Sequence, residues 1–243
     1  MPETDYLAEG RRTAIRPYDP GDAEEFTARV RESRELHHPW LFPPTDVTAY
    51  AVYAGRLADD PARTGFLVCE RERGHDDEHA RVHVPERGRG RRDGAAAGDR
   101  PDRRNASGER PADGRIAGFI NINNIVRGGF RCGALGYGAF AHAAGRGLMS
   151  EGLELVLRHA FGPLDLHRLE VNIQPANRAS LALVRRAGFR REGFSPDFLF
   201  IDGAWRDHER WAITAEMPRP TASRAKHSPP TRPEHGIMSG SGY

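Results

Sequence analysis

The apolar positions of this chain recur with two periods, and the change of period divides the chain into predicted strands and helices. Short apolar runs between glycine, proline or polar clusters are typical of strands, and they occupy residues 13–17, 65–69, 115–123, 132–141 and 167–173. Asp202 followed by Gly203 predicts a tight hairpin between two final strands. Together with the helices, these segments predict an α/β (α+β) fold built on a mixed sheet.

Three other segments have apolar positions or end signals that predict helices. Over residues 148–161 the apolar side chains fall on one stripe, and polar residues occupy the opposite side. Residues 177–189 predict a short helix, with Asn177 as its N-cap and Gly188 as the left-handed residue after its end. Residues 19–38 predict one or two further helices.

Two long segments lack the apolar residues that a core requires. Residues 72–113 consist mainly of Gly, Arg, Asp, Glu and Ala, and residues 217–243 are rich in Pro, Ser and His. Such segments cannot bury enough apolar surface to offset the entropy lost on ordering. We therefore predict one domain over residues 13–216, interrupted by a disordered insertion at 72–113 and flanked by disordered residues 1–12 and 217–243.

Charge and cysteine content exclude several classes of protein. The formal net charge is only +2, and the arginines near residues 87–92 lie among acidic residues without interleaved aromatic rings, so we expect no nucleic-acid partner. Cys69 and Cys132 lie in apolar, strand-like surroundings and predict buried thiols rather than a disulfide framework. Without metal-ligand spacing, a membrane-length apolar run or a signal peptide, we expect no metal, no membrane association and a cytoplasmic protein.

The candidate chemistry begins at residues 142–149, His-Ala-Ala-Gly-Arg-Gly-Leu-Met, where a predicted strand is followed by a predicted helix. Gly145 and Gly147 allow the backbone to approach a ligand closely, because neither carries a Cβ. The unpaired N–H groups at a helix start, together with the helix dipole, form a cradle for phosphate. Taken alone, an ordinary strand-to-helix turn explains the same glycine pattern equally well.

Further stretches accompany this loop in a characteristic order: a strand, the glycine loop, a helix, a strand, an Asn-x-x-Ser helix and Gly-Phe. With residues 124–130, 135–137 and 201–208, they resemble the GCN5-related N-acetyltransferases (GNAT), and most closely the ribosomal-protein-alanine N-acetyltransferases of the Rim type. The resemblance covers about residues 13–215 apart from the insertion. It implies a GNAT acyltransferase fold, with a mixed sheet of six to seven strands flanked by helices and acetyl-CoA as cofactor.

In that family two central parallel strands, here residues 132–141 and 168–173, splay apart to admit the pantetheine arm of the cofactor. A backbone N–H near Phe140 is then expected to face the thioester oxygen. The resemblance also implies that the cofactor diphosphate binds the backbone N–H groups of Ala144, Gly145, Arg146, Gly147 and Leu148, with added charge from the Arg146 side chain. His142 stands where the family commonly has Gln or Arg, which leaves the backbone cradle intact but puts the side-chain contribution in doubt.

Asn177 and Ser180 match the Asn-x-x-Ser element, which implies that Asn177 contacts the pantetheine arm and that Ser180 is a candidate acid for the departing thiolate. A helix N-cap followed by a first-turn polar residue gives the same pattern without catalysis. The general base is the least defined role, because residues 198–200, Phe-Leu-Phe, stand where related enzymes often carry a Glu. His208 is one candidate base, and a solvated side chain on an exposed hairpin is the alternative interpretation of it. A water chain could also accept the proton, because an α-amino group has a pKa of about 8 and is already partly neutral.

Residues 33–41, Ser-Arg-Glu-Leu-His-His-Pro-Trp-Leu, resemble a Rim-type stretch that lines the acceptor groove together with the last hairpin. We expect Trp40 to be structural and Glu35 and His37 to face the substrate. The sequence thus indicates an acetyl-CoA-dependent N-acetyltransferase that acts on a protein N-terminus, with a ribosomal protein as the family-implied acceptor. Acetylation of a small amine such as an antibiotic, and a non-catalytic acyl-CoA-binding module, remain the alternatives.

Overall fold

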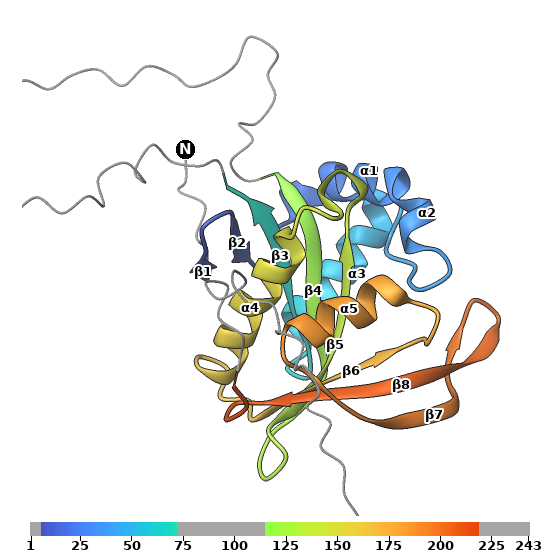
Figure 1. Ribbon diagram of the computed structural model, residues 1–243. Helices are drawn as coiled ribbons and strands as arrows, with labels where there is room; N and C mark the ends of the chain where they lie inside the picture. The colour runs from blue at the N-terminus through green and yellow to red at the C-terminus, as the bar shows by residue number, and fades with distance from the viewer. Residues whose placement is uncertain (1–5, 72–114, 219–243) are drawn as a thin grey trace, which may run out of the picture.

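The computed structural model describes residues 6–71 and 115–218, which form one mixed sheet with helices on both faces (Figure 1). The strands are β1 (Ala8–Glu9), β2 (Thr13–Arg16), β3 (Thr64–Glu70), β4 (Ile116–Val126), β5 (Cys132–Ala139), β6 (Arg168–Ile173), β7 (Arg190–Ile201) and β8 (Ala204–Thr214). The α-helices are α1 (Ala23–Glu32), α2 (Arg34–His37), α3 (Val47–Asp59), α4 (Leu148–Phe161) and α5 (Arg178–Arg186). The expected fold class is therefore confirmed.

The strand order among the described residues is β1-β2-β3-β4-β5-β6-β8-β7, and only β5 and β6 pair in parallel. The sheet has eight strands rather than the expected six to seven, because β1 pairs with β2 in the register Ala8↔Ile15. The prediction of disorder over residues 1–12 is therefore wrong for β1, whose short strand carries too few residues to give a visible alternation. The predicted insertion at 72–113 lies outside the described residues.

Met217, the first residue of the predicted tail, is part of the packed domain. Met217 packs against the hydrophobic core, and its N–H donates to the Thr214 carbonyl at 3.2 Å. This contact falls inside the segment 217–243 for which the sequence predicts disorder, so that prediction is wrong for Met217. The rest of that segment, from residue 219, lies outside the described residues.

Both faces of β3 are buried, which explains its continuous apolar run. Phe66 and Val68 belong to the core cluster that includes α4, whereas Leu67 and Cys69 belong to the cluster that includes α1. Successive strand side chains point to opposite faces, so a strand covered on both sides is apolar throughout. Gly152 of α4 permits a close approach, because a Cβ there would lie 2.7 Å from a Val68 methyl carbon.

Helix α3 is the element that the sequence pattern does not predict. Asp46 caps its start by accepting a hydrogen bond from the Ala49 N–H at 2.8 Å. Only Tyr50 and Leu57 of this helix are buried, while Val52 remains exposed. With apolar residues on both the buried and the solvent side, the helical period is weak.

The two helices that flank the predicted site form as expected. Helix α4 ends at Phe161, and α5 is capped by Asn177, whose Oδ1 accepts from the Ser180 N–H at 3.0 Å. After α5, Gly188 has a φ of 90°, and the Phe189 N–H donates to a carbonyl of the last helical turn at 3.0 Å. These local predictions are confirmed.

The cysteines and the helices of residues 6–71 and 115–218 bear on the expected protein class. Cys69 and Cys132 are both free thiols; Cys69 is fully buried and Cys132 is partly exposed. No helix in these residues combines the length and the apolar character that a membrane crossing requires.

Candidate active site

The candidate site lies where β5 and β6 separate. The two strands pair only through Cys132↔Arg168, Gly133↔Leu169 and Ala134↔Glu170. Beyond these pairs β5 continues with β4 and β6 continues with β8, so the strands diverge in space (Figure 1). The expected splay of the central parallel strands is confirmed.

A groove of about 570 Å³ lies beside this opening. Its walls come from α2, the end of β5, the glycine loop before α4, and α5. Of the predicted site residues, those that line the groove are Ala144, Gly145, Gly147, Asn177 and Ser180. The structure therefore brings the glycine loop and the Asn-x-x-Ser element, which are distant in sequence, to one cavity.

The glycine loop leaves only some of its N–H groups unpaired. Those of Ala144 and Arg146, which were expected to bind the diphosphate, donate to carbonyls of the preceding turn at 3.3 and 3.4 Å. Gly145 and Gly147 have φ values of 73° and 80°, a left-handed conformation that only glycine adopts without strain. No side chain caps α4 at Gly147, and within the described residues no acceptor is bonded to the N–H groups of Gly147 or Leu148. The loop therefore has the geometry of an anion cradle.

The Arg146 side chain lies elsewhere than expected. Its guanidinium pairs with the Glu70 carboxylate of β3, with one Nη1–Oε2 distance of 3.0 Å. Arg12, which sequence reasoning missed, instead lies over the loop: its Nη1 donates to the Arg146 carbonyl at 3.0 Å, and its Nη2 is 3.1 Å from where a Gly147 Cβ would stand. Because the two partners are 134 positions apart, no local pattern connects them.

The Phe140 N–H itself does not face the gap between β5 and β6. This group donates to the Ala117 carbonyl of β4 at 2.9 Å, and the Phe140 ring is fully buried in the core. Hydrogen-bonding directions alternate along a strand, so the N–H groups that face the gap toward β6 belong to Tyr137 and Ala139. A ligand carbonyl in the gap would meet those two donors.

His142 does not line the groove. Neither of its ring nitrogens has a hydrogen-bond partner among the described residues. Burial, and then the nearby Arg29 and Arg115 charges, lower its pKa, so the ring is neutral at neutral pH. The structure therefore gives His142 no visible part in the groove.

Ser180 meets an aromatic partner inside the groove. Its Oγ lies 2.6 Å from the Tyr137 hydroxyl of β5, 43 positions away in the chain. Burial raises the pKa of Tyr137 to about 12, so this hydroxyl keeps its proton at neutral pH. The pair places an exchangeable proton beside the glycine loop, and Tyr137 is a site residue that sequence reasoning did not identify.

These features can be compared with known proteins. The acetyltransferase (GNAT) domain family matches residues 12–190 of the chain. This chain belongs to the GNAT family. GNAT proteins take their acetyl group from acetyl-CoA, which is the cofactor that the groove was expected to hold.

One GNAT relative is the [ribosomal protein uS5]-alanine N-acetyltransferase of Escherichia coli (strain K12), 40% identical over 104 residues that cover 43% of this chain and 54% of that protein. The chain thus spans about half the length of the curated relatives it matches. Among solved structures, Mycobacterium smegmatis RimJ in complex with CoA-disulfide has a TM-score of 0.62 at 24% identity, covering 84% of this chain and 82% of the other. A ribosomal-protein-S5-alanine acetyltransferase from Vibrio fischeri has a TM-score of 0.63 at 20% identity, covering 87% and 98%. These likenesses confirm the GNAT fold.

His208 is not brought to the groove of this GNAT domain. The side chain is only 2% exposed, and its Nδ1 donates to the Arg206 carbonyl at 2.8 Å while the ring packs against Phe198. Burial lowers its pKa. His208 is therefore neither in the groove, as a catalytic base would be, nor exposed to solvent on the hairpin.

Two side chains one helical turn apart hold the end of β5. Ser33 Oγ accepts a hydrogen bond from the Ala141 N–H at 2.9 Å, and His37 Nε2 donates to the Ala139 carbonyl at 2.8 Å. The carbonyl can only accept, so the proton of a neutral His37 ring is on Nε2. This double contact fixes the strand end at the mouth of the GNAT groove.

Within residues 33–41, the side chains that line the groove are only partly those expected. His37, only 3% exposed, lines the groove as expected, but so does Trp40, which was expected to be structural. Glu35 is exposed and does not line it.

Buried histidines give this GNAT domain a predicted pH dependence. Burial is the main cause that lowers the pKa of His37, His142, His159 and His208. The unfolded chain therefore takes up protons first, and the free energy of unfolding is expected to fall as the pH drops below about 6.5. His37→Gln keeps an N–H donor for the Ala139 carbonyl but cannot be protonated, so its free energy of unfolding should fall less.

Urea unfolding at about pH 7.5 and about pH 5.5 measures this difference. His38→Gln, at the exposed neighbouring position, serves as the control and should keep the dependence of the unchanged protein. An equal loss of stability in the His37 and His38 variants would contradict the prediction.

Proposed function

We propose that this protein transfers the acetyl group of acetyl-CoA to the N-terminal α-amino group of a protein, with a ribosomal protein as the acceptor that its relatives suggest. The observation that carries the proposal is the groove beside the splayed strands, which is lined in part by a glycine loop with unpaired N–H groups. A GNAT domain that only bound its cofactor would need the loop, but it would not need the Ser180–Tyr137 pair beside it.

The chain supplies groups that would bind the diphosphate and groups that would bind the thioester. The N–H groups of Gly147 and Leu148 would hold the diphosphate. The Arg12 guanidinium adds positive charge beside them, partly compensated by Glu151, whose Oε2 lies 3.4 Å from Arg12 Nε. The gap-facing N–H groups of Tyr137 and Ala139 would bind the thioester carbonyl oxygen and stabilise the charge that develops there. Bound acetyl-CoA supplies an acyl carbon that an uncharged amine can attack.

Proton transfer falls to the Ser180–Tyr137 pair. Ser180 would donate its hydroxyl proton to the departing sulfur and be resupplied by the Tyr137 hydroxyl at 2.6 Å, which in turn recovers its proton from solvent. The proposal assigns no side chain as base. An α-amino group with a pKa near ~8 is partly neutral at neutral pH, and it can release its proton to water.

The groove chemistry supports a protein terminus over a polycationic amine. Among the described residues that line the groove none is acidic, and Arg186 adds a positive charge. A polyamine would find no carboxylate to compensate its charges there.

Thiol release from acetyl-CoA tests the proposal. Three acceptors are compared: a peptide with a free N-terminus and no lysine, a peptide with a blocked N-terminus and one lysine, and spermidine. We expect release with the first alone, with the acetyl group located on the α-nitrogen by mass spectrometry. Release with spermidine alone would favour a small-molecule acceptor, and acetyl-CoA binding without any release would favour a non-catalytic module.

A further inference from the structure

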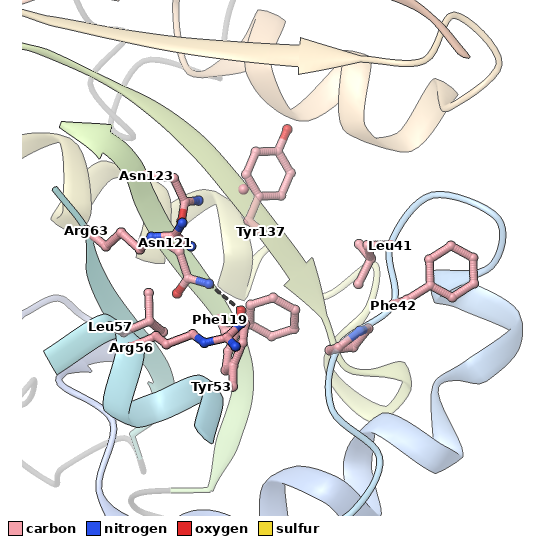
Figure 2. A pocket seen from close by; sticks show the side chains of 12 residues that line it. Leu41, Phe42, Tyr53, Arg56, Leu57, Arg63, Phe119, Asn121, Asn123 and Tyr137 are labelled. Carbon is pink, nitrogen blue, oxygen red and sulfur yellow. Dashed lines mark hydrogen bonds between the residues drawn. The ribbon is translucent and has the colours of Figure 1, made fainter. Parts of the chain in front are cut away.

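A second cavity, of about 350 Å³, lies on the other side of Tyr137 from the cofactor groove. Figure 2 shows it between α3, β4 and the loop that carries Leu41 and Phe42. In this view the Tyr137 ring stands beside Asn123 and above Asn121, and its hydroxyl is directed away from the pocket. Tyr137 and Leu41 line both cavities, so the pocket adjoins the groove that Ser180 lines.

The polar floor of the pocket is fixed by a hydrogen-bonded chain. The Tyr18 hydroxyl donates to Asn121 Oδ1 at 3.1 Å, and Asn121 Nδ2 donates to the Tyr53 hydroxyl oxygen (Figure 2). Asn121 is only 5% exposed, so its amide is held in one orientation. The Tyr53 oxygen accepts this hydrogen bond, and its hydroxyl also interacts with that of Tyr18, so its proton can be donated either to Tyr18 or to a ligand.

The charged side chains that line the pocket are all positive. Arg56 and Arg63 line the pocket, and none of its lining residues within the described part of the chain is acidic. Arg63 is partly compensated by Asp60, whose Oδ2 lies 3.0 Å from its Nε. No described side chain forms an ion pair or hydrogen bond with the Arg56 guanidinium. The pocket therefore offers hydrogen-bond donors and positive charge, which fit a carboxylate.

We infer that this pocket selects acceptors that carry an acidic side chain just after the residue to be acetylated. The inference rests on the proposed function, because it takes the acceptor amine to lie near Ser180, across Tyr137 from the pocket. Arg56 and Arg63 bind the carboxylate together with the Tyr53 hydroxyl, while Phe42 and Phe119 contact the aliphatic stem. The bound carboxylate offsets the repulsion between these arginines and any remaining ammonium form of the acceptor.

The test uses one peptide series with a free N-terminus, identical except for Asp, Asn or Lys at the second position. We expect kcat/KM for the Asp peptide to exceed that for the Asn peptide about tenfold, or about 1.4 kcal/mol. The Lys peptide should be poorer than the Asn peptide. The Asp advantage of the unchanged protein should shrink as the salt concentration rises, because the contact is between charges.

Arg56→Gln and Arg63→Gln should each lower the Asp/Asn ratio, with the larger loss for Arg56, whose charge is not shared with an aspartate. Arg158→Gln, on the exposed side of α4, is the matched control and should keep the full ratio. Equal kcat/KM for the Asp and Asn peptides would overturn the inference while leaving the proposed function in place. Acetylation of none of the peptides, with spermidine or a lysine side chain acetylated instead, would reject the proposed function and the inference with it.

Discussion

Replacing Gly147 with glutamate is expected to weaken acetyl-CoA binding by about 100-fold, the largest effect on cofactor binding that the structure predicts. At this position a side chain would start 3.1 Å from Arg12 Nη2, beside the N–H groups at the start of α4. A carboxylate there would add a second negative charge beside the Arg12–Glu151 ion pair, occupy the cradle as an internal anion and repel the diphosphate. A repulsion of about 3 kcal/mol accounts for the expected loss. Isothermal titration with acetyl-CoA measures it.

Gly147→Gln separates charge from backbone strain. The two variants share the side-chain shape and the cost of placing a non-glycine residue at a φ of 80°, which is about 1 kcal/mol. The Gln variant should therefore lose much less affinity than the Glu variant. Circular dichroism confirms that both remain folded, and a folded Glu variant with unchanged affinity would remove the loop from the cofactor site.

Ser180→Ala is expected to lower kcat by about 100-fold, the loss typical when a general acid is removed. The KM for the acceptor should change little, because the hydroxyl acts on the departing sulfur and not on the bound amine. Tyr137→Phe should have a smaller effect, since Ser180 can still be resupplied by water. If the two hydroxyls act in one relay, the double variant should be no slower than Ser180→Ala alone.

Ser150→Ala provides the matched control for this prediction. Ser150 also lines the groove, but it lies in the first turn of α4 and has no contact with Tyr137 among the described hydrogen bonds. Steady-state kinetics with saturating acetyl-CoA should leave its kcat near that of the unchanged protein. A Ser180→Ala variant with full kcat would mean that the sulfur receives its proton from another source.

The sequence specifies those parts of the site that depend on neighbouring residues. Gly145 and Gly147 adopt the left-handed conformation, Asn177 caps α5, and Gly188 follows its end, as the local pattern predicts. Each of these features is decided by backbone sterics or by a hydrogen bond that spans only a few positions. The splay of β5 and β6 was also anticipated, although from family resemblance and not from the residues themselves.

Features that join distant segments were missed or wrongly placed. The Phe140 N–H is used by β4, because the direction of a strand's hydrogen bonds depends on which neighbour it pairs with. His208 is buried away from the groove by the packing of the last hairpin, and Tyr137 meets Ser180 only because β5 passes beneath α5. No periodicity in the chain encodes such meetings.

The sequence by itself determined the family, the order of the elements apart from β1 and α3, and the backbone conformation of the glycine loop, because these follow from short-range backbone preferences and contiguous motifs. Only the tertiary structure decided which polar groups face the groove, that Arg12 rather than Arg146 lies over the loop, and that a basic pocket adjoins Tyr137. The physical reason is that these positions are set by strand pairing and core packing, which bring together residues that share no local signal.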